Sequence, residues 1–374
     1  MKLEIIGYVP LEGDGRYVGT TLPERPPTFA NIARWLRAHE EAGFDNVLLA
    51  TSDSNGSFGR FGPVMDAWTS AAALAVATSR IKLLLAIQTG LVNPALAAKM
   101  CATLDHIGGG RFTFNFVSGS NPLRGWGDYL DHDARYRRTA EYLTIVKGLW
   151  TQREFSFEGE FYRLENVVSE PKPLQVPYPP VFFSGLSPSA QAISAREADV
   201  QLIHTEPPEK VGELVASLGA RAAAHGRCLQ FGVRLLLMVR PTQAEALAAC
   251  RRLLERADPE LVARRTAERA GTESTQIRRH SASAPGPGAP DPHLVGPNLW
   301  GGLRTVRSGA GVILYGTPDQ VIARMLEYVR VGVSHFVISG FPIEEEATII
   351  GREVIGTLRQ EAAAARVPLT TAGA

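Results

Sequence analysis

Short, continuously apolar segments recur along the whole chain, and longer amphipathic segments separate them. Strands covered on both faces have this continuous apolar character, whereas strands with one face in water alternate. The pattern therefore predicts a parallel sheet with helices outside it. The predicted strands are residues 3–8, 46–50, 81–87, 112–117, 180–184, 200–204, 231–239 and 334–339, and the predicted helices are residues 31–42, 66–78, 94–106, 135–150, 189–198, 208–225, 243–257 and 318–331.

Eight strand–helix units fit a (β/α)8 TIM barrel, which needs roughly 250 residues before insertions. The chain has 374 residues, so we expect one barrel domain over residues 1–374 with inserted segments. Alternating residues 155–164 predict a β-hairpin. Residues 264–297 form a Gly/Pro-rich insertion, with five prolines and three glycines between 281 and 297, and we expect them to be irregular. This insertion is either a passive surface loop or a mobile lid, and its place before the last unit favours a lid.

The charge balance and the cysteines limit the partners and the compartment. Thirty-nine basic and 38 acidic residues give a net charge of +1, which removes the attraction that nucleic acids and acidic lipids require. No apolar run approaches the roughly 20 residues that span a bilayer. Cys101, Cys228 and Cys250 are widely spaced without a CxxC pair, so neither a disulfide framework nor a zinc site is indicated. We expect a cytoplasmic protein.

Polar residues at the predicted strand ends are candidates for chemistry, because a TIM barrel builds its active site at the C-terminal ends of its strands. His204 and Arg234 belong to this set. His132 and Tyr136 are four residues apart at a helix start and are expected to share a face. Ser187 follows a strand and opens a helix, so it is either a simple N-cap or part of a phosphate site. The eight histidines lack metal-binding spacing, so we expect no metal.

Several motifs extend over nearly the whole chain in a characteristic order. They include VPLEGDGRYVGTT at 9–21, EAGFDNVLLAT at 41–51, YLDHDARYRR at 129–138, PNLWGGLRTVRSGAG at 297–311 and FVISGFP at 336–342. Together they resemble the bacterial luciferase-like, flavin-dependent monooxygenases. The sequence is most similar to the alkanesulfonate monooxygenase branch, with dimethylsulfone monooxygenase as a neighbour.

This resemblance implies a cofactor and the residues that bind it. The cofactor is reduced FMN, which a separate NAD(P)H-dependent flavin reductase supplies as a transient partner. The resemblance also implies a homodimer or homotetramer and a non-proline cis peptide bond between Ala86 and Ile87. It assigns Ala50, Thr51, Ala86 and Asn115 to the flavin ring system, and His132, Arg135, Tyr136 and Ser187 to the ribityl phosphate.

The resemblance further implies a two-component FMNH2-dependent monooxygenase. It uses O2 through a flavin peroxide to oxygenate a small organosulfur compound, alkanesulfonate-like or sulfone-like, or a related metabolite. Arg234 and Arg307 match the arginines that line the sulfonate and peroxide region; the alternative for each is a salt bridge at the barrel rim. His204 is either an acid or base in the reaction or an inert histidine. Whether the peroxide sits on a flavin carbon or nitrogen is left open.

Three departures from the alkanesulfonate pattern concern the substrate. Glu12 stands where that branch has a histidine, Leu236 replaces another histidine, and Phe341 replaces a tyrosine. Groups that transfer protons contribute about 100- to 10,000-fold in rate, so their loss argues against simple desulfonation and favours a more apolar substrate. Two alternatives stay open: a deazaflavin-dependent oxidoreductase of the same fold, and a flavin-binding homologue without catalysis.

Overall fold

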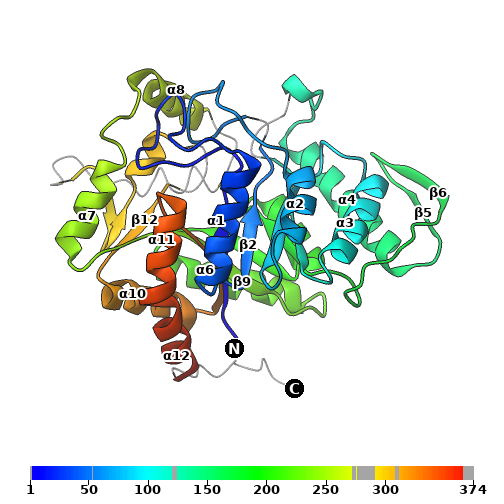
Figure 1. Ribbon diagram of the computed structural model, residues 1–374. Helices are drawn as coiled ribbons and strands as arrows, with labels where there is room; N and C mark the ends of the chain where they lie inside the picture. The colour runs from blue at the N-terminus through cyan, green and yellow to red at the C-terminus, as the bar shows by residue number, and fades with distance from the viewer. Residues whose placement is uncertain are drawn as a thin grey trace.

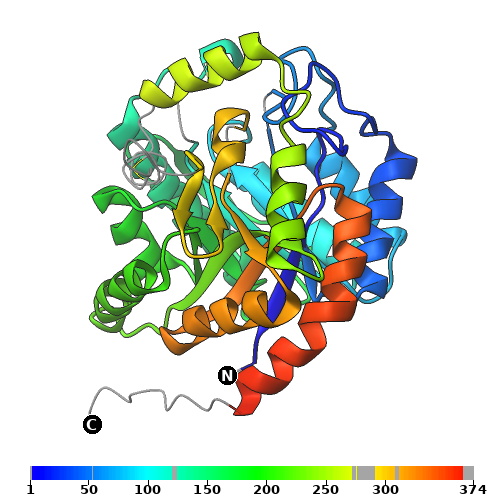
Figure 2. The ribbon, with the colours of Figure 1, turned by 90° about the vertical axis from the view of Figure 1, so that its left-hand side faces the viewer.

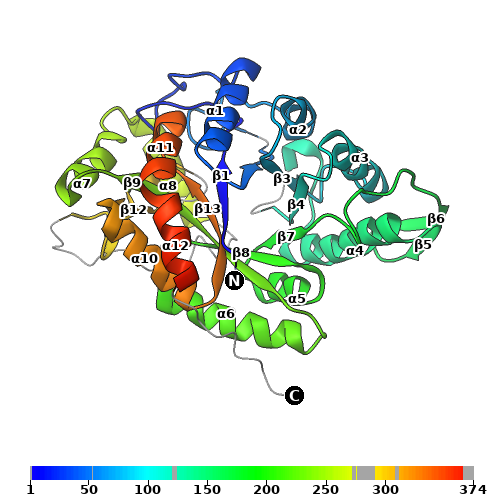
Figure 3. The same ribbon diagram turned by 60° about the horizontal axis from the view of Figure 1, so that its bottom comes forward.

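The computed structural model describes residues 2–52, 54–119, 124–271, 275, 291–307 and 311–364. Eight parallel strands close into a barrel, and helices surround it (Figures 1 and 3). The barrel strands are β1 (Glu4–Tyr8), β2 (Asn46–Leu49), β3 (Lys82–Gln88), β4 (Phe112–Val117), β7 (Val181–Ser184), β8 (Val200–His204), β9 (Gln230–Val239) and β13 (Val333–Ser339). The ring closes where β9 pairs with both β8 and β13. The predicted TIM barrel is confirmed.

The helices lie outside this ring and alternate with its strands. They are α1 (Phe29–Glu41), α2 (Ala67–Val76), α3 (Pro94–Ile107), α4 (His132–Thr151), α5 (Pro188–Glu197), α6 (Pro208–Ala223), α7 (Gln243–Arg252), α10 (Pro318–Arg330), α11 (Ile343–Ile350) and α12 (Gly356–Ala364). A π-helical turn, Gly351–Ile355, joins α11 to α12. No helix among the described ranges is both long and apolar enough to cross a membrane.

Side chains alternate between the barrel interior and the helical layer, as strand geometry requires. On β4, Phe112, Phe114 and Phe116 belong to the main core between strands and helices, whereas Asn115 lies between them in sequence and is buried. A separate apolar cluster fills the barrel: Ile6, Tyr8, Leu48, Leu84, Ala86, Phe182, Val200, Leu202 and Val337. The strands are thus apolar on both faces, which explains their continuous apolar sequence.

The first insertion is the predicted hairpin. Strands β5 (Phe155–Glu158) and β6 (Arg163–Val167) pair in antiparallel fashion and form a sheet of their own. The hairpin projects from the barrel beyond α4 (Figure 1).

The second insertion differs in part from the prediction. Helix α8 (Pro259–Ala270) enters the segment 264–297, and β10 (Leu294–Gly296) closes it. The helix forms because Pro259 occupies its first turn and the Asp258 carboxylate caps it by accepting from the amides of Glu260 and Leu261. Residues 272–274 and 276–290 lie outside the described residues, so the mobile lid stays a prediction.

After β10 the chain adds further strands to the sheet, and we did not predict these strands from the sequence. Strands β11 (Leu299–Trp300) and β12 (Ile313–Gly316) continue from β10, and β12 pairs in parallel with the C-terminal half of β9. A short 3-10 helix, η2 (Gly302–Thr305), lies between β11 and β12. Figure 2 shows α8 lying across the top of the barrel, at the end away from the N-terminus. These elements lie around the C-terminal mouth of the barrel and extend its rim.

Candidate active site

A row of side chains lines the C-terminal mouth of the barrel, and the strand register sets their order. Ala86 on β3 is the register partner of Asn115 on β4, and His204 on β8 is the register partner of Arg234 on β9. Tyr8 ends β1 and belongs to the barrel interior. Residues far apart in the sequence therefore meet at one end of the barrel.

The residues assigned to the flavin ring lie next to one another on neighbouring strands. The Thr51 hydroxyl donates to the Ala86 carbonyl oxygen at 2.6 Å, which ties the end of β2 to β3. The Ser184 hydroxyl donates to Asn115 Oδ1 at 3.2 Å, which ties β4 to β7. Ala50 packs against the interior cluster that contains Ala86, so the side chains at the ends of β2 and β3 are small. This side of the mouth offers small side chains next to one buried amide.

The predicted cis peptide bond between Ala86 and Ile87 is wrong. The cis bonds among the described residues all precede proline, at Pro171, Pro177 and Pro342. Strand β3 continues through both residues, and each has a parallel register partner on β4. Regular parallel pairing fits the ordinary trans bond, whereas a non-proline cis bond costs about 3 to 4 kcal/mol.

The residues assigned to the phosphate gather where β7 leads into α5. Ser187 caps α5, because its hydroxyl accepts from the Ala190 amide at 3.2 Å. Gly185 has φ +135°, and a Cβ atom built on it would lie 2.9 Å from Ala190 Cβ and 3.0 Å from the Tyr136 hydroxyl oxygen. No other residue fits there without a shift. The Tyr136 hydroxyl thus lies against the backbone just before the helix N-terminus.

The ring of His132 packs against Tyr136, and the Arg135 guanidinium lies at the turn before α4. The rings of His132 and Tyr136 are 4.8 Å apart, as their spacing on one helix face predicted. His132 Nδ1 lies 2.8 Å from Asp133 Oδ1, which fixes the imidazole. Arg135 is completely buried, and one of its guanidinium nitrogens donates to the Leu130 carbonyl at 3.0 Å. Its guanidinium therefore stabilises the turn before α4.

Arg234 lies on the opposite side of the mouth from the small side chains, over the ring of Tyr8 at 4.7 Å. Burial lowers the pKa of Arg234, and the nearby charge of Arg307 lowers it further. Burial also raises the pKa of the Tyr8 hydroxyl, and the Glu12 carboxylate adds to this effect. The phenol therefore stays protonated at neutral pH, and it is available as a hydrogen-bond donor.

Arg307 is held by residues from two N-terminal loops. Its Nε donates to the Ser57 hydroxyl oxygen at 3.0 Å, and its guanidinium lies 3.9 Å from a Glu12 oxygen. Glu12 also accepts from the Gly56 amide at 2.9 Å and from the Ser57 hydroxyl. The Arg307 guanidinium lies over the Phe341 ring at 5.0 Å. Arg307 therefore forms an ion pair with Glu12, and it also lies next to the mouth of the barrel.

Two of the departures from the alkanesulfonate pattern form an apolar wall beside this arginine. Leu236 and Phe341 are buried in a cluster that also contains Leu303 and Val306, the residues just before Arg307. Tyr8 and Ser57 were not among the site residues predicted from the sequence. The position of Tyr8 at a predicted strand end was a usable signal, whereas Ser57 lies in a loop 250 residues from its partner Arg307.

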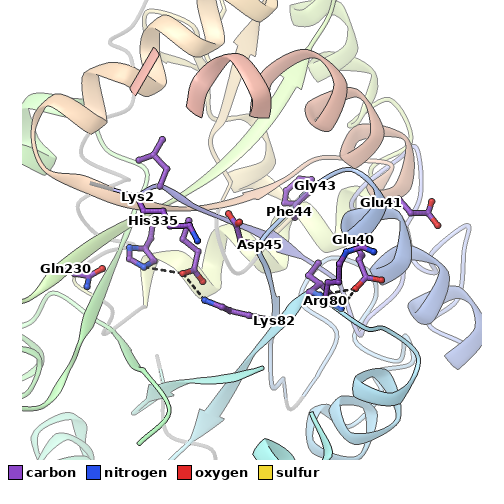
Figure 4. A pocket seen from close by; sticks show the side chains of 13 residues that line it. Lys2, Glu40, Glu41, Gly43, Phe44, Asp45, Arg80, Lys82, Gln230 and His335 are labelled. Carbon is purple, nitrogen blue, oxygen red and sulfur yellow. Dashed lines mark hydrogen bonds and ion pairs between the residues drawn. The ribbon is translucent and has the colours of Figure 1, made fainter. Parts of the chain in front are cut away.

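A cavity of about 620 Å³ lies at the opposite, N-terminal end of the barrel (Figure 4). There the Glu4 carboxylate accepts from Asn46 Nδ2 at 3.0 Å, and Asn46 also donates to Thr113 Oγ1 at 3.1 Å. Lys82 and His335 lie 3.5 Å and 3.8 Å from Glu4. These charges compensate one another, and this face of a TIM barrel contributes stability rather than chemistry.

Comparisons with known proteins identify the family and the fold. The luciferase-like monooxygenase family matches residues 8–335. The structure is similar to riboflavin lyase (RcaE), solved with a modified FMN and riboflavin, with 21% identity and a TM-score of 0.77 over 96% of this chain and 92% of that one. Long-chain alkane monooxygenase (LadA) has 18% identity and a TM-score of 0.75 over 96% and 92% of the two chains.

A third similar structure has a different cofactor. It is an F420-dependent secondary alcohol dehydrogenase, with 16% identity and a TM-score of 0.68 over 95% of this chain and 98% of that one. These identities show a shared fold, and the match over residues 8–335 identifies the family. The chain belongs to the luciferase-like monooxygenase family.

Proposed function

We propose that this protein is a two-component monooxygenase that uses reduced FMN from a separate NAD(P)H-dependent reductase. Its substrate is a small organosulfur compound with a polar sulfur–oxygen group and an apolar body. The observation that carries this proposal is the continuous row from Thr51 through Ala86, Asn115 and Ser184 to Ser187. This row leads from the small side chains of Ala50 and Ala86 to the N-terminus of α5.

The phosphate end of the row fits FMN. A helix N-terminus supplies free backbone N–H groups and a favourable dipole for an anion. Gly185 leaves the space that a Cβ atom would fill, and the Tyr136 hydroxyl lies beside that space. Asp133 engages His132 Nδ1, which leaves Nε2 to be directed at a phosphate oxygen. Tyr136, His132 and Ser187 would therefore hold the phosphate.

The ring end of the row fits a planar aromatic system. Ala50 and Ala86 leave room above the barrel interior, and Asn115 presents a buried amide from β4. An amide both donates and accepts hydrogen bonds, which suits the polar edge of an isoalloxazine.

The other side of the mouth fits the substrate. Arg234 and Arg307 supply permanently charged guanidinium groups, and Glu12 supplies one carboxylate near them. The excess positive charge favours a sulfone or sulfonate oxygen. Phe341 and Leu236 supply the apolar wall for the rest of the molecule.

Reduced FMN, when bound, supplies the electrons that activate dioxygen. The protein's residues position and shelter the reacting groups. Arg234 and Arg307 stabilise negative charge at the mouth, and the buried Tyr8 hydroxyl donates a hydrogen bond without losing its proton. Helix α8 and the β10–β12 extension restrict access of water to the mouth.

Stopped-flow oxidation of reduced FMN tests the proposal. The protein, premixed with reduced FMN, is mixed with dioxygen in the presence or absence of dimethyl sulfone or methanesulfonate. We expect flavin reoxidation that is slower than that of free FMN and that an accepted substrate accelerates. Reoxidation identical to that of free FMN would contradict the proposal. Tight binding of reduced F420 without reaction with dioxygen would instead favour a deazaflavin enzyme.

A further inference from the structure

We propose that Arg265, Arg269 and Arg304 form a second, outer oxyanion site that holds an acidic group at the far end of the substrate. This inference rests on the proposed function only in assigning the reacting end of that substrate to Arg234 and Arg307. It adds that the substrate carries a carboxylate or a sulfonate away from the oxidised atom.

The outer site is built by two elements above the mouth. Arg265 and Arg269 lie on α8, and Arg304 lies on η2, which packs against α8. Arg265 donates to the Asn55 carbonyl oxygen at 2.9 Å, which fixes α8 to the loop that carries Ser57. Arg269 donates to the Arg307 carbonyl oxygen at 3.3 Å. The outer site is therefore continuous with Arg307 at the inner mouth.

Among the described residues, carboxylates balance the charges of the outer site only in part. The Glu268 carboxylate pairs with Arg264 and Arg265. No carboxylate within the described ranges lies at ion-pair distance from Arg269 or Arg304. The Nε atoms of Arg265, Arg269 and Arg304 are buried without a hydrogen-bond partner. Buried polar groups are normally paired, and an anionic ligand would supply acceptors for these nitrogens.

The electrostatic environment agrees with this geometry. Burial, together with the nearby charge of Arg269, lowers the pKa of Arg304 to about 10. Burial and the charge of Arg265 also lower the pKa of Arg269. Like charges gathered away from water destabilise each other unless an anion neutralises them.

The chemistry of the ligand follows from the guanidinium groups. Their planar forks bind the paired oxygens of a carboxylate or sulfonate. A free inorganic anion offers the same oxygens, but the bond from Arg269 to Arg307 places the outer site next to the substrate position. We therefore assign the outer site to an acidic group of the substrate itself.

Anion binding to the FMN-free protein tests this inference by isothermal titration calorimetry at low ionic strength. The probes are inorganic sulfate, dicarboxylates from succinate to suberate, and the monocarboxylate that matches each in length. We expect one dicarboxylate to bind at least tenfold more tightly than its matched monocarboxylate and more tightly than sulfate. Arg269→Gln and Arg304→Gln should abolish this advantage. The control Arg252→Gln removes the same charge from an exposed position on α7 and should change affinity less than twofold.

Thermal unfolding separates a binding role from a structural one. Removal of an unneutralised charge should raise the melting temperature of Arg304→Gln without added anion, whereas loss of a structural contact would lower it.

Two results of the binding experiment would overturn the inference. One is equal affinity for sulfate and the dicarboxylates, and the other is an equal loss of dicarboxylate affinity in Arg304→Gln and Arg252→Gln. FMN affinity is measured in the same variants and should not change. A failure to bind FMN with intact dicarboxylate binding would count against the proposed function alone.

Discussion

The two ends of the barrel use charged residues in opposite ways. At the N-terminal end, Glu4 is surrounded by Asn46, Lys82 and His335, so that each charge has a partner. At the C-terminal mouth, the guanidinium groups of Arg234 and Arg307 lie close enough to lower the pKa of Arg234, and the Glu12 carboxylate lies near both. Balanced networks stabilise a fold, whereas two cations held close together repel each other and favour a ligand of the opposite charge. The difference assigns stability to one end and binding to the other.

The largest expected effect is a loss of turnover caused by a substitution at the C-terminal mouth. Arg234→Met removes a buried charge across the mouth from Ala50 and Ala86, and it should lower turnover about 100- to 1000-fold. FMN affinity should stay within twofold, because the proposed phosphate contacts lie at the other side of the mouth. Coupled assays with the flavin reductase and direct FMN titration measure these quantities. Arg234→Lys, which keeps the charge, should recover part of the turnover; an equal loss of FMN affinity would show that Arg234 is structural.

The next effect is on stability and depends on pH. His39 on α1 is buried, which lowers its pKa to about 4 in the folded protein. The unfolded chain has a histidine pKa near 6.5, so it binds more protons than the folded protein between these values. The contribution of His39 to the free energy of unfolding should therefore fall by about 3 kcal/mol as pH decreases from 6.5 to 4. Urea unfolding of wild type and His39→Gln across this range measures the effect, and an equal pH dependence in both would contradict it.

Loss of the proposed phosphate contacts should have an intermediate effect, on the affinity for FMN. Tyr136→Phe combined with Ser187→Ala should weaken FMN binding by about 1 to 3 kcal/mol, through lost hydrogen bonds to a charged group. Fluorescence titration measures the dissociation constant. Ser194→Ala is the control, since this buried serine on the same helix has no hydrogen-bond partner for its hydroxyl. An unchanged constant in the double variant would mean that the phosphate binds elsewhere.

The smallest effect is expected at the N-terminal end. Asn46→Leu leaves the acceptors on Glu4 and Thr113 without their donor and should lower the free energy of unfolding by about 1.5 kcal/mol. Its FMN affinity should equal that of wild type. Gln230→Leu, at an exposed position of the same cavity, should change stability by less than about 0.5 kcal/mol. Weaker FMN binding in Asn46→Leu would remove the distinction between the two ends.

The sequence was most informative where local pattern determines structure. The barrel strands were predictable because each is apolar on both faces, and the His132–Tyr136 pair followed from helix spacing. Helix α8 was missed because the prediction for residues 264–297 rested on the Gly/Pro composition that begins after the helix, although Asp258 and Pro259 mark its start. Contacts such as that of Arg307 with Ser57 depend on closure of the whole barrel, so no local signal predicts them. The cis bond was carried over from relatives, and regular pairing of β3 excludes it here.

A crystal structure with bound FMN tests the central claim most directly. The account predicts the ring system above Ala50 and Ala86, with the phosphate within hydrogen-bond distance of Ser187 Oγ and the Tyr136 hydroxyl. FMN bound in the N-terminal cavity, or at the mouth with its phosphate on Arg234, would contradict it.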